Sequence, residues 1–420
     1  MNPLLQKILS ATGLVRRGDL VEATHAIRRA LQGDVTPAKS ATPAASRQAS
    51  AVTASADVLD GLVREVEPAA HASTAFPETE TETEAEAEAK SEPPRAGRFV
   101  ESSFTGEAGT RSFKLFEPAG FEGRALPLVV MLHGCTQDPD DFAAGTRMNA
   151  LAQEQGLFVL YPAQAPRSNA HKCWNWFVPG DQRRGRGEPS LLAGMTRHVM
   201  ETHPVDADRV WVAGLSAGGA MAAILAREYP DLFAAAGIHS GLPPGAAHDV
   251  VSAFSAMKSG ALGALPGWPG ASGQVPLRAP LVAWPGTATA EVGAFEPAAH
   301  AARGAPVIVF HGDADSTVNA LNGSHAVDAA LGTSPSVAIR ESGLAGDGAG
   351  RAFTRTVYRP AATPEPSPSR VEHWVVHGAG HAWSGGDTAG SFTEGEGPDA
   401  SREMLRFFAE HPRKRTAPKE

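Results

Sequence analysis

The sequence lacks any long uninterrupted apolar run. No segment approaches the roughly 18 consecutive apolar residues of a membrane-spanning helix, so we expect no such span. The apolar residues near the N-terminus are broken by Gln6, Lys7 and Ser10, and Arg16 and Arg17 follow them rather than precede them. This order is not typical of a secretory signal peptide, and it favours a cytoplasmic location.

Cysteine and basic residues are also scarce. The 420 residues include two cysteines, Cys135 and Cys173, which are too few for a disulfide-built fold or a cysteine-based zinc site. Lysine and arginine number 37 against 46 aspartates and glutamates, so the formal net charge is −9. Nucleic-acid binding needs a basic surface that displaces phosphate counterions, and this composition therefore argues against that class of protein.

Composition divides the chain into four segments. Residues 1–32 carry apolar residues at helical spacing and predict short amphipathic helices, which either mediate protein contacts or decorate the main domain. Residues 33–97 are rich in Ala, Thr, Pro and Glu and poor in large apolar side chains, so they predict a disordered acidic linker. Residues 98–412 form the predicted catalytic domain, and residues 413–420 form a basic tail.

The segment 98–412 alternates β-type apolar runs with helical patterns, which predicts an α/β fold with a mostly parallel sheet and helices on both faces. The stretch 250–304 is rich in Gly, Pro and Ala, and is either a lid-like insertion or disordered. The predicted strands are 112–116, 128–133, 157–161, 210–213, 234–239, 307–310 and 373–376. The predicted helices are 140–155, 190–202, 217–228 and 400–410.

A serine lies in the pattern G-x-S-x-G at 214–218. An apolar β-type run leads into it and a helix-forming run follows, which is the strand–turn–helix context of a nucleophile elbow. The glycines two residues before and after Ser216 leave room for the sharp turn. At the start of the following helix, free N–H groups favour developing negative charge. We therefore predict Ser216 as the nucleophile.

A serine nucleophile needs a base, and the base needs an orienting carboxylate. Further along the chain, the apolar run 307–310 ends in His-Gly and is followed by Asp313 and Asp315. That is the edge where open α/β sheets place their ligands. We predict Asp315 as the orienting acid, with Asp313 as the alternative. Both aspartates could instead cap the loop through bonds to its backbone.

The base is expected after the aspartate in chain order. His381 lies in a glycine-rich loop just beyond a predicted strand, where it could reach Ser216, and it is our choice with His377 as the fallback. His373 falls within a strand pattern and His411 precedes a proline at the end of a helix. The oxyanion hole needs two backbone donors, and we assign them to the amides of Ala217 and Cys135.

Five ordered motifs carry a family resemblance. Together they resemble the esterase family of polyhydroxybutyrate (PHB) depolymerases, to which feruloyl and acetylxylan esterases are related. The likeness covers about residues 98–412. The motifs are HGCTQ at 133–137, CWNWF at 173–177, GLSAGG at 214–219, HGDAD at 311–315 and GHAWSGG at 380–386.

The resemblance implies an α/β-hydrolase fold and a serine carboxylesterase, often secreted into the extracellular region. Ser216, Asp315 and His381 match the family's triad positions. A disulfide between Cys135 and Cys173 is expected in an oxidising compartment, and two free buried thiols are expected otherwise. Three tryptophans lie in the same loops and either wall an ester pocket or pack in the core. They are Trp174, Trp176 and Trp383.

The sequence also departs from the family pattern. It carries the N-terminal extension and the long 250–304 segment, and no separate polymer-binding domain is recognised, which argues against attack on crystalline polymer. The favoured function is hydrolysis of hydroxyalkanoate esters through an acyl-enzyme, without metal or other cofactor. Feruloyl or acetylxylan esterase activity is the first alternative. Two further alternatives are a serine peptidase and a non-catalytic granule-surface or scaffolding protein.

Overall fold

The protein is described from a computed structural model over residues 97–260, 304–333, 335–346, 348–361 and 369–413. The predicted N-terminal helices, almost all of the acidic linker, residues 261–303 of the predicted insertion and most of the basic tail lie outside these residues. Among the residues described, no helix is both long and apolar enough to cross a membrane.

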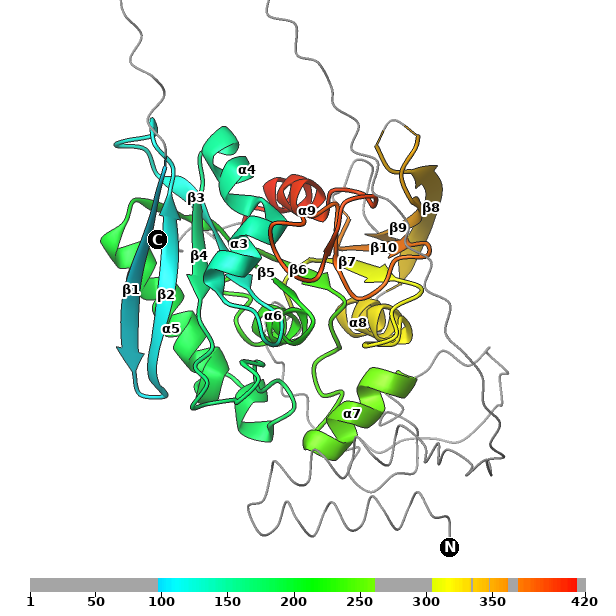
Figure 1. Ribbon diagram of the computed structural model, residues 1–420, viewed down its shortest axis with the longest axis horizontal. Helices are drawn as coiled ribbons and strands as arrows, with labels where there is room; N and C mark the ends of the chain where they lie inside the picture. The colour runs from blue at the N-terminus through cyan, green and yellow to red at the C-terminus, as the bar shows by residue number, and fades with distance from the viewer. Residues whose placement is uncertain (1–96, 261–303, 334, 347, 362–368, 414–420) are drawn as a thin grey trace, which may run out of the picture. The chain divides into compact units, whose positions relative to one another are not determined.

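Ten strands of the described residues form one sheet in the order β1-β2-β4-β3-β5-β6-β7-β10-β9-β8 (Figure 1). The six strands from β4 to β10 pair in parallel, whereas the strands at both edges pair antiparallel. The strands are β1 (Arg98–Gly106), β2 (Gly109–Glu117), β3 (Leu126–Leu132), β4 (Phe158–Pro162), β5 (Val205–Leu215), β6 (Ala235–His239), β7 (Val307–Gly312), β8 (Ser336–Leu344), β9 (Ala352–Pro360) and β10 (Val371–Val376).

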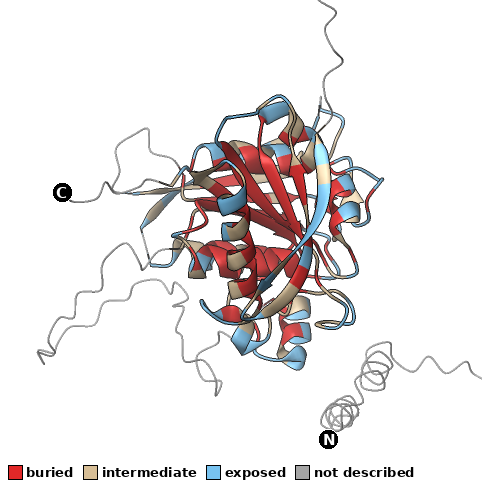
Figure 2. Ribbon diagram, turned by 90° about the vertical axis from the view of Figure 1, so that its left-hand side faces the viewer, coloured by how far each residue is buried: buried red, intermediate tan, exposed pale blue. Residues whose placement is uncertain are grey.

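Helices cover both faces of the sheet because the central strands are apolar on both sides. Every residue of β3 is buried; Leu128 and Val130 pack into one core and Val129 into the other, as the two-residue period of a strand requires (Figure 2). The first core is covered by α5 (Gly187–Thr202), α6 (Ala217–Glu228), α7 (Val250–Ser259) and α8 (Leu321–Leu331). The second is covered by α3 (Pro139–Thr146), α4 (Met148–Gln155) and α9 (Ala400–Ala409).

One predicted helix differs from the structure, and the predicted insertion is described only at its start. The single helix predicted over 140–155 is two helices, because Arg147 adopts a left-handed backbone with φ of 53° and ends α3 before α4 begins. The segment predicted as an insertion from residue 250 begins with α7, which starts at a capping box between Asp249 and Ser252. Only two small residues of α7, Ala253 and Ala256, are buried, so its apolar periodicity is weak.

A buried carboxylate joins the last strands to the last helix. Glu372 on β10 is 1% exposed and accepts two hydrogen bonds from Arg355 on β9, at 3.0 and 2.9 Å. It also accepts one from Arg406 on α9 at 2.7 Å. Burial alone would raise the pKa of Glu372, but the two guanidinium groups lower it below its ordinary value. The ionised carboxylate therefore stabilises the packing of α9 against the sheet.

Replacing Glu372 by Gln is expected to lower the free energy of unfolding by about 3 kcal/mol, because two arginines would lose their buried counter-charge. Urea unfolding followed by circular dichroism measures the change. The matched control is Glu341→Gln, since Glu341 also bonds Arg355 but its side chain is 55% exposed. That exposed pair should contribute less than about 1 kcal/mol. Equal effects of the two variants would contradict the assignment.

Several histidines are buried in the neutral form at or near the sheet. His133 follows β3, His239 ends β6, and His373 lies within β10. Burial lowers the pKa of His133 and of His373 to about 4, and that of His239 to about 3, from an ordinary 6.5. The unfolded chain thus takes up protons below pH 6.5 that the folded chain rejects, and stability falls as the pH decreases through this range.

We expect each of these histidines to cost about 2 kcal/mol of stability between pH 7.5 and pH 5, since one pKa unit corresponds to about 1.4 kcal/mol. Urea unfolding at both pH values tests this. His373→Phe keeps an aromatic ring and should reduce the acid loss by that amount. His248→Gln, at an exposed position, should leave the loss unchanged. An identical acid loss in wild type and His373→Phe would rule the explanation out.

Candidate active site

Ser216 sits in a tight turn between β5 and α6. Its backbone has φ of 58° and ψ of −118°, a strained conformation for a residue other than glycine. A side chain at Gly214 or at Gly218 would collide with backbone atoms, including the carbonyl of Leu132 on the neighbouring strand. The two glycines therefore allow β5 and α6 to approach β3 closely enough for the turn to form.

Asp315 and His381 form a hydrogen-bonded pair beyond the ends of β7 and β10, in which Asp315 is buried and His381 partly buried. The Nδ1 atom of His381 lies 2.7 Å from Oδ2 of Asp315, whose side chain is fully buried. The other carboxylate oxygen accepts hydrogen bonds from the amides of Thr317 and Val318 at 2.9 and 2.8 Å. This arrangement can hold the His381 proton on Nδ1 and leave Nε2 free to accept another.

The surroundings of Asp315 stabilise its ionised form. Burial by itself would raise the pKa of this carboxyl. The hydrogen bonds from His311 and His381 and the amide of Val318 outweigh burial and hold the pKa well below its ordinary value. His311, on β7, places Nε2 3.5 Å from Asp315 Oδ2 and 2.9 Å from the carbonyl of Val318. Asp315 is therefore a carboxylate at neutral pH.

The alternative aspartate and histidine form a second pair. His377 Nδ1 lies 2.8 Å from Asp313 Oδ2, and the amide of Gly378 donates to Asp313 Oδ1 at 2.6 Å. Their side chains are 42% and 41% exposed, however, so water screens this pair. The other two candidate histidines are buried among protein atoms. His373 lies within β10, and His411 Nδ1 lies 2.6 Å from the carbonyl of Phe407.

The loop after β3 carries the predicted oxyanion donors. The amide of Gly134 donates to Gln137 Oε1 at 2.9 Å, and the amide of Thr136 donates to the carbonyl of His171 at 2.7 Å. Within the described residues, the amides of Cys135 and Ala217 donate to no protein acceptor. Both are therefore available to a substrate oxygen, as an oxyanion hole requires.

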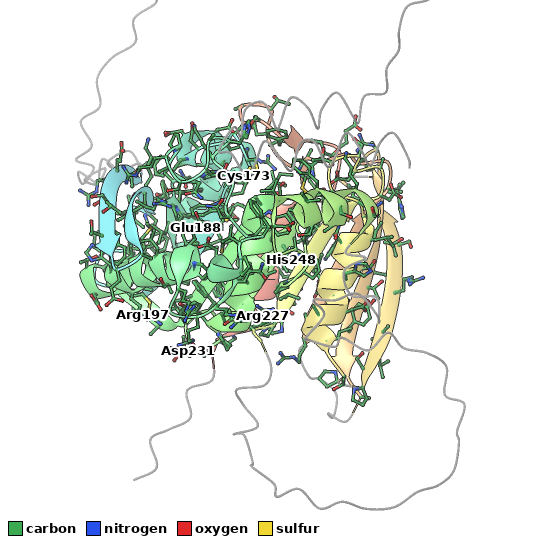
Figure 3. The ribbon with its side chains drawn as sticks, turned by 90° about the horizontal axis from the view of Figure 1, so that it is seen from below. Cys173, Glu188, Arg197, Arg227, Asp231 and His248 are labelled. Atoms are coloured by element: carbon green, nitrogen blue, oxygen red, sulfur yellow. A yellow bond between two sulfur atoms is a disulfide. The ribbon has the colours of Figure 1, made fainter. Side chains whose placement is uncertain are left out.

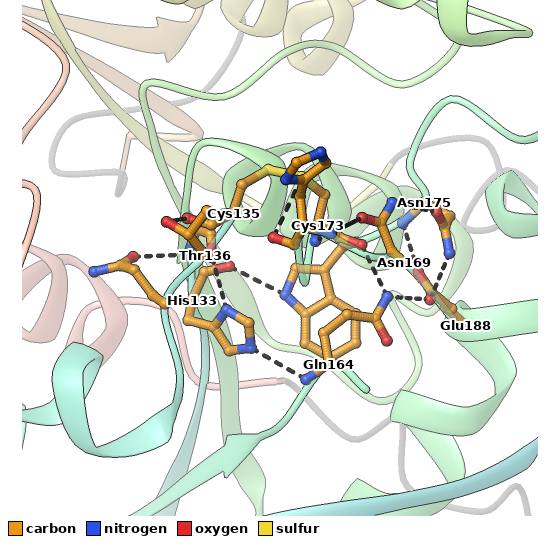
Figure 4. The surroundings of a disulfide bond; sticks show 12 residues. His133, Cys135, Thr136, Gln164, Asn169, Cys173, Asn175 and Glu188 are labelled. Carbon is orange, nitrogen blue, oxygen red and sulfur yellow. Dashed lines mark hydrogen bonds between the residues drawn. A yellow bond between two sulfur atoms is a disulfide. The ribbon is translucent and has the colours of Figure 1, made fainter. Parts of the chain in front are cut away.

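A disulfide joins the sulfurs of Cys135 and Cys173 and ties this loop to the CWNWF loop (Figure 4). Next to it, His133 Nδ1 lies 2.7 Å from the carbonyl of Gly134, and Nε2 accepts the amide of Gln164 at 3.1 Å. The indole of Trp174 donates to the carbonyl of His133 at 3.1 Å. The neutral His133 thereby joins the start of the loop after β3 to the segment that follows β4.

Glu188 supports the CWNWF loop from α5 (Figures 3 and 4). Its carboxylate accepts the amide and the side-chain N–H of Asn175 at 2.7 and 3.0 Å, and it also bonds the side chain of Gln164. Burial raises the pKa of Glu188 above its ordinary value. The loop that carries Cys173 is thus held by polar contacts as well as by the disulfide.

The three tryptophans proposed as pocket walls belong to the core. Trp174 and Trp176 are buried in the core beneath α5 and α6, and Trp383 is buried in the opposite core. The Trp383 indole donates to Ser401 Oγ at 3.1 Å and its ring stacks on His239. The burial of these side chains favours the core-packing alternative, because their flat surfaces are covered by protein.

His239 is a site residue that the sequence reasoning missed. Its carbonyl accepts the amide of Ser216 at 2.9 Å, and its Nε2 accepts the amide of Ser384 at 3.0 Å. The nearby His311 and His381 lower the pKa of His239 further, beyond the effect of burial. Through its carbonyl and its neutral ring, His239 connects the turn of Ser216 to the loop that follows His381. The sequence pattern that could have indicated His239 is its position at the end of a buried strand, the edge where α/β sheets place their ligands.

Within the described ranges, no group of three or more His, Cys, Asp and Glu side chains is arranged to hold a metal ion. The candidate site comprises a serine in a strained turn, the Asp315–His381 pair and two amides that donate to no acceptor among the described residues. These are the groups that acyl transfer through a serine requires.

Residues 111–265 match the family model described as Esterase PHB depolymerase. Over 159 residues the chain is 40% identical to poly(3-hydroxyalkanoate) depolymerase C of Paucimonas lemoignei, which covers 38% of each protein. Over 128 residues it is 33% identical to feruloyl esterase B of Thermothelomyces thermophilus, covering 30% of this chain and 43% of that protein. The chain thus spans less than half the length of these relatives.

Among solved structures, an acetyl xylan esterase from Aspergillus awamori superposes with a TM-score of 0.50 at 16% identity. The match covers 74% of this chain and 99% of that one, and it shows the fold. Ser216 lies inside the segment that the family model matches, whereas Asp315 and His381 lie beyond it. By these matches residues 111–265 are similar to the Esterase PHB depolymerase family, and the chain has an α/β-hydrolase fold.

Proposed function

We propose that the protein is a serine carboxylesterase that hydrolyses hydroxyalkanoate esters, as oligomers or short polymers. The observation that carries the proposal is the hydrogen bond between the buried Asp315 and His381, formed beyond β7 and β10 on the same sheet whose strand β5 leads into the strained turn of Ser216. The relative named as a poly(3-hydroxyalkanoate) depolymerase supports the substrate class. The relative named as a feruloyl esterase supports aryl esters as the second candidate.

The proposed reaction begins with attack of Ser216 Oγ on the ester carbonyl. His381 Nε2 takes the hydroxyl proton, and the ionised Asp315 stabilises the imidazolium that results. The amides of Cys135 and Ala217 stabilise the negative charge on the carbonyl oxygen. The intermediate then collapses, the C–O bond to the alcohol breaks, and His381 returns the proton to the leaving oxygen.

Water completes the cycle. His381 takes a proton from a water molecule, whose oxygen attacks the acyl carbon bonded to Ser216 Oγ. The second tetrahedral intermediate releases the acid, and the proton passes from His381 back to Ser216 Oγ. The products are one alcohol and one carboxylic acid, and the enzyme groups return to their starting protonation states.

Replacing Ser216 by Ala is expected to lower kcat by about 10⁴-fold or more, because the nucleophile is lost. The substrates are 3-hydroxybutyrate oligomers, amorphous polymer and methyl ferulate, assayed by titration of released acid. Wild type should act on the oligomers with a higher kcat/KM than on methyl ferulate. The control is Ser342→Ala on the edge strand β8, which should keep wild-type rates. Retained turnover in Ser216→Ala would refute the proposed nucleophile, and preference for methyl ferulate would favour the second candidate.

The two Asp–His pairs provide a matched comparison. Asp315→Asn should lower kcat/KM by about 10⁴-fold, because an amide neither fixes the required tautomer nor stabilises the imidazolium. Asp313→Asn should change kcat/KM by less than about 3-fold, because its pair is exposed and screened. Thermal unfolding of both variants checks that they are folded. A larger loss in Asp313→Asn than in Asp315→Asn would overturn the assignment.

A further inference from the structure

Phe392 is an exposed aromatic side chain next to the proposed base. It is 46% exposed, and its ring meets the ring of His381 edge-on, with centroids 6.4 Å apart and planes at 77°. It directly precedes β12 (Thr393–Glu394), which pairs with β11 (Trp383–Ser384) beyond His381. None of the steps proposed above uses this side chain. An apolar ring kept in water beside a reactive imidazole is available to a ligand.

The backbone of Phe392 is strained. Its φ is 52°, in the left-handed region that residues with a side chain rarely adopt, and such strain persists only where the surroundings enforce it. Here the carbonyl of Phe392 accepts the amide of Trp383 at 2.7 Å, and Trp383 is fixed in the core. This hydrogen bond therefore fixes the backbone that places the Phe392 ring against His381.

The preceding residue anchors the same loop to the oxyanion side of the site. The amide and hydroxyl of Ser391 donate to the two carboxylate oxygens of Asp141, at 2.8 and 2.6 Å. Gln137 donates to the carbonyl of Ser391 at 3.0 Å while accepting the amide of Gly134 at 2.9 Å. Phe392 is thus positioned relative to the oxyanion loop and the base at once.

The proposed reaction indicates which part of an ester lies beside Phe392. His381 must return a proton to the leaving alcohol oxygen, so a side chain against its ring lies beside the alcohol portion of the substrate. Phe392 is uncharged and flat, and it offers dispersion and apolar contact rather than hydrogen bonds. In an oligoester, the leaving alcohol is the remainder of the chain, which also presents apolar surface.

We propose that Phe392 is a specificity-determining residue that contacts the apolar alcohol portion of the ester. The inference rests on the proposed function and refines it. The Phe392 side chain selects substrates whose leaving alcohol extends at least several carbon atoms from the scissile bond. It does not discriminate between acyl groups. Loss of this contact lowers kcat/KM for esters of large apolar alcohols and leaves esters of methanol nearly unaffected.

The test is Phe392→Ala assayed with methyl, butyl and benzyl butyrate, which share one acyl group. The parameter is kcat/KM from titration of released acid, because it reports the acylation step even where deacylation limits kcat. The ratio of benzyl to methyl butyrate should fall about 10-fold in the variant, a size typical of a lost apolar contact. Phe392→Leu should restore part of the ratio, since it restores apolar area.

Two controls separate this effect from general damage. Leu344→Ala removes a side chain that is 53% exposed on β8, and its ratios should equal those of wild type. Methyl acetate, butyrate and hexanoate vary the acyl group, and their ratios should not change in Phe392→Ala. An unchanged benzyl-to-methyl ratio, or a change confined to the acyl series, would overturn the inference while the esterase proposal stands. A wild type inactive on every ester would overturn both.

Discussion

A close approach of two backbones determines the geometry of the candidate site. Gly218, in the first turn of α6, packs against the carbonyl of Leu132 at the end of β3, with no room for a side chain between them. This contact sets Ser216 and the amide of Ala217 beside the loop that carries Cys135. A methyl group at Gly218 would collide with the Leu132 carbonyl and push α6 away from β3.

Neutral histidines extend that constraint to the surrounding loops. His133 and His239 each accept a backbone amide through Nε2, from Gln164 and Ser384 respectively. A charged imidazolium has no acceptor nitrogen, so protonation would break both contacts. Burial keeps these rings neutral. It therefore also preserves the hydrogen bonds that hold the loop after β3 and the loop after His381. Two neutral imidazoles thus hold the backbone of loops around Ser216 and His381.

The sequence predicted the features that depend on local pattern. The α/β fold class and the family resemblance were confirmed. Buried parallel strands appear in the sequence as apolar runs, and the motifs around Ser216 and His133 are continuous in the chain. What it missed depends on distant contacts. The bond between Gln137 and Ser391 joins residues 254 positions apart, and no pattern in either segment indicates the other. The break at Arg147 likewise coincides with a tertiary contact, in which its guanidinium donates to the carbonyl of Gly385 at 3.0 Å.

Burial, rather than hydrogen-bond length, distinguishes the two Asp–His pairs. Both join the end of β7 to the end of β10, and their distances of 2.7 and 2.8 Å are nearly equal. The side chain of Asp315 is fully buried whereas that of Asp313 is 41% exposed. The attraction between a carboxylate and an imidazolium grows as water is removed, provided that the carboxylate remains ionised. The amides of Thr317 and Val318 meet that condition for Asp315, so the buried pair can stabilise a charge that the exposed pair would leave to solvent.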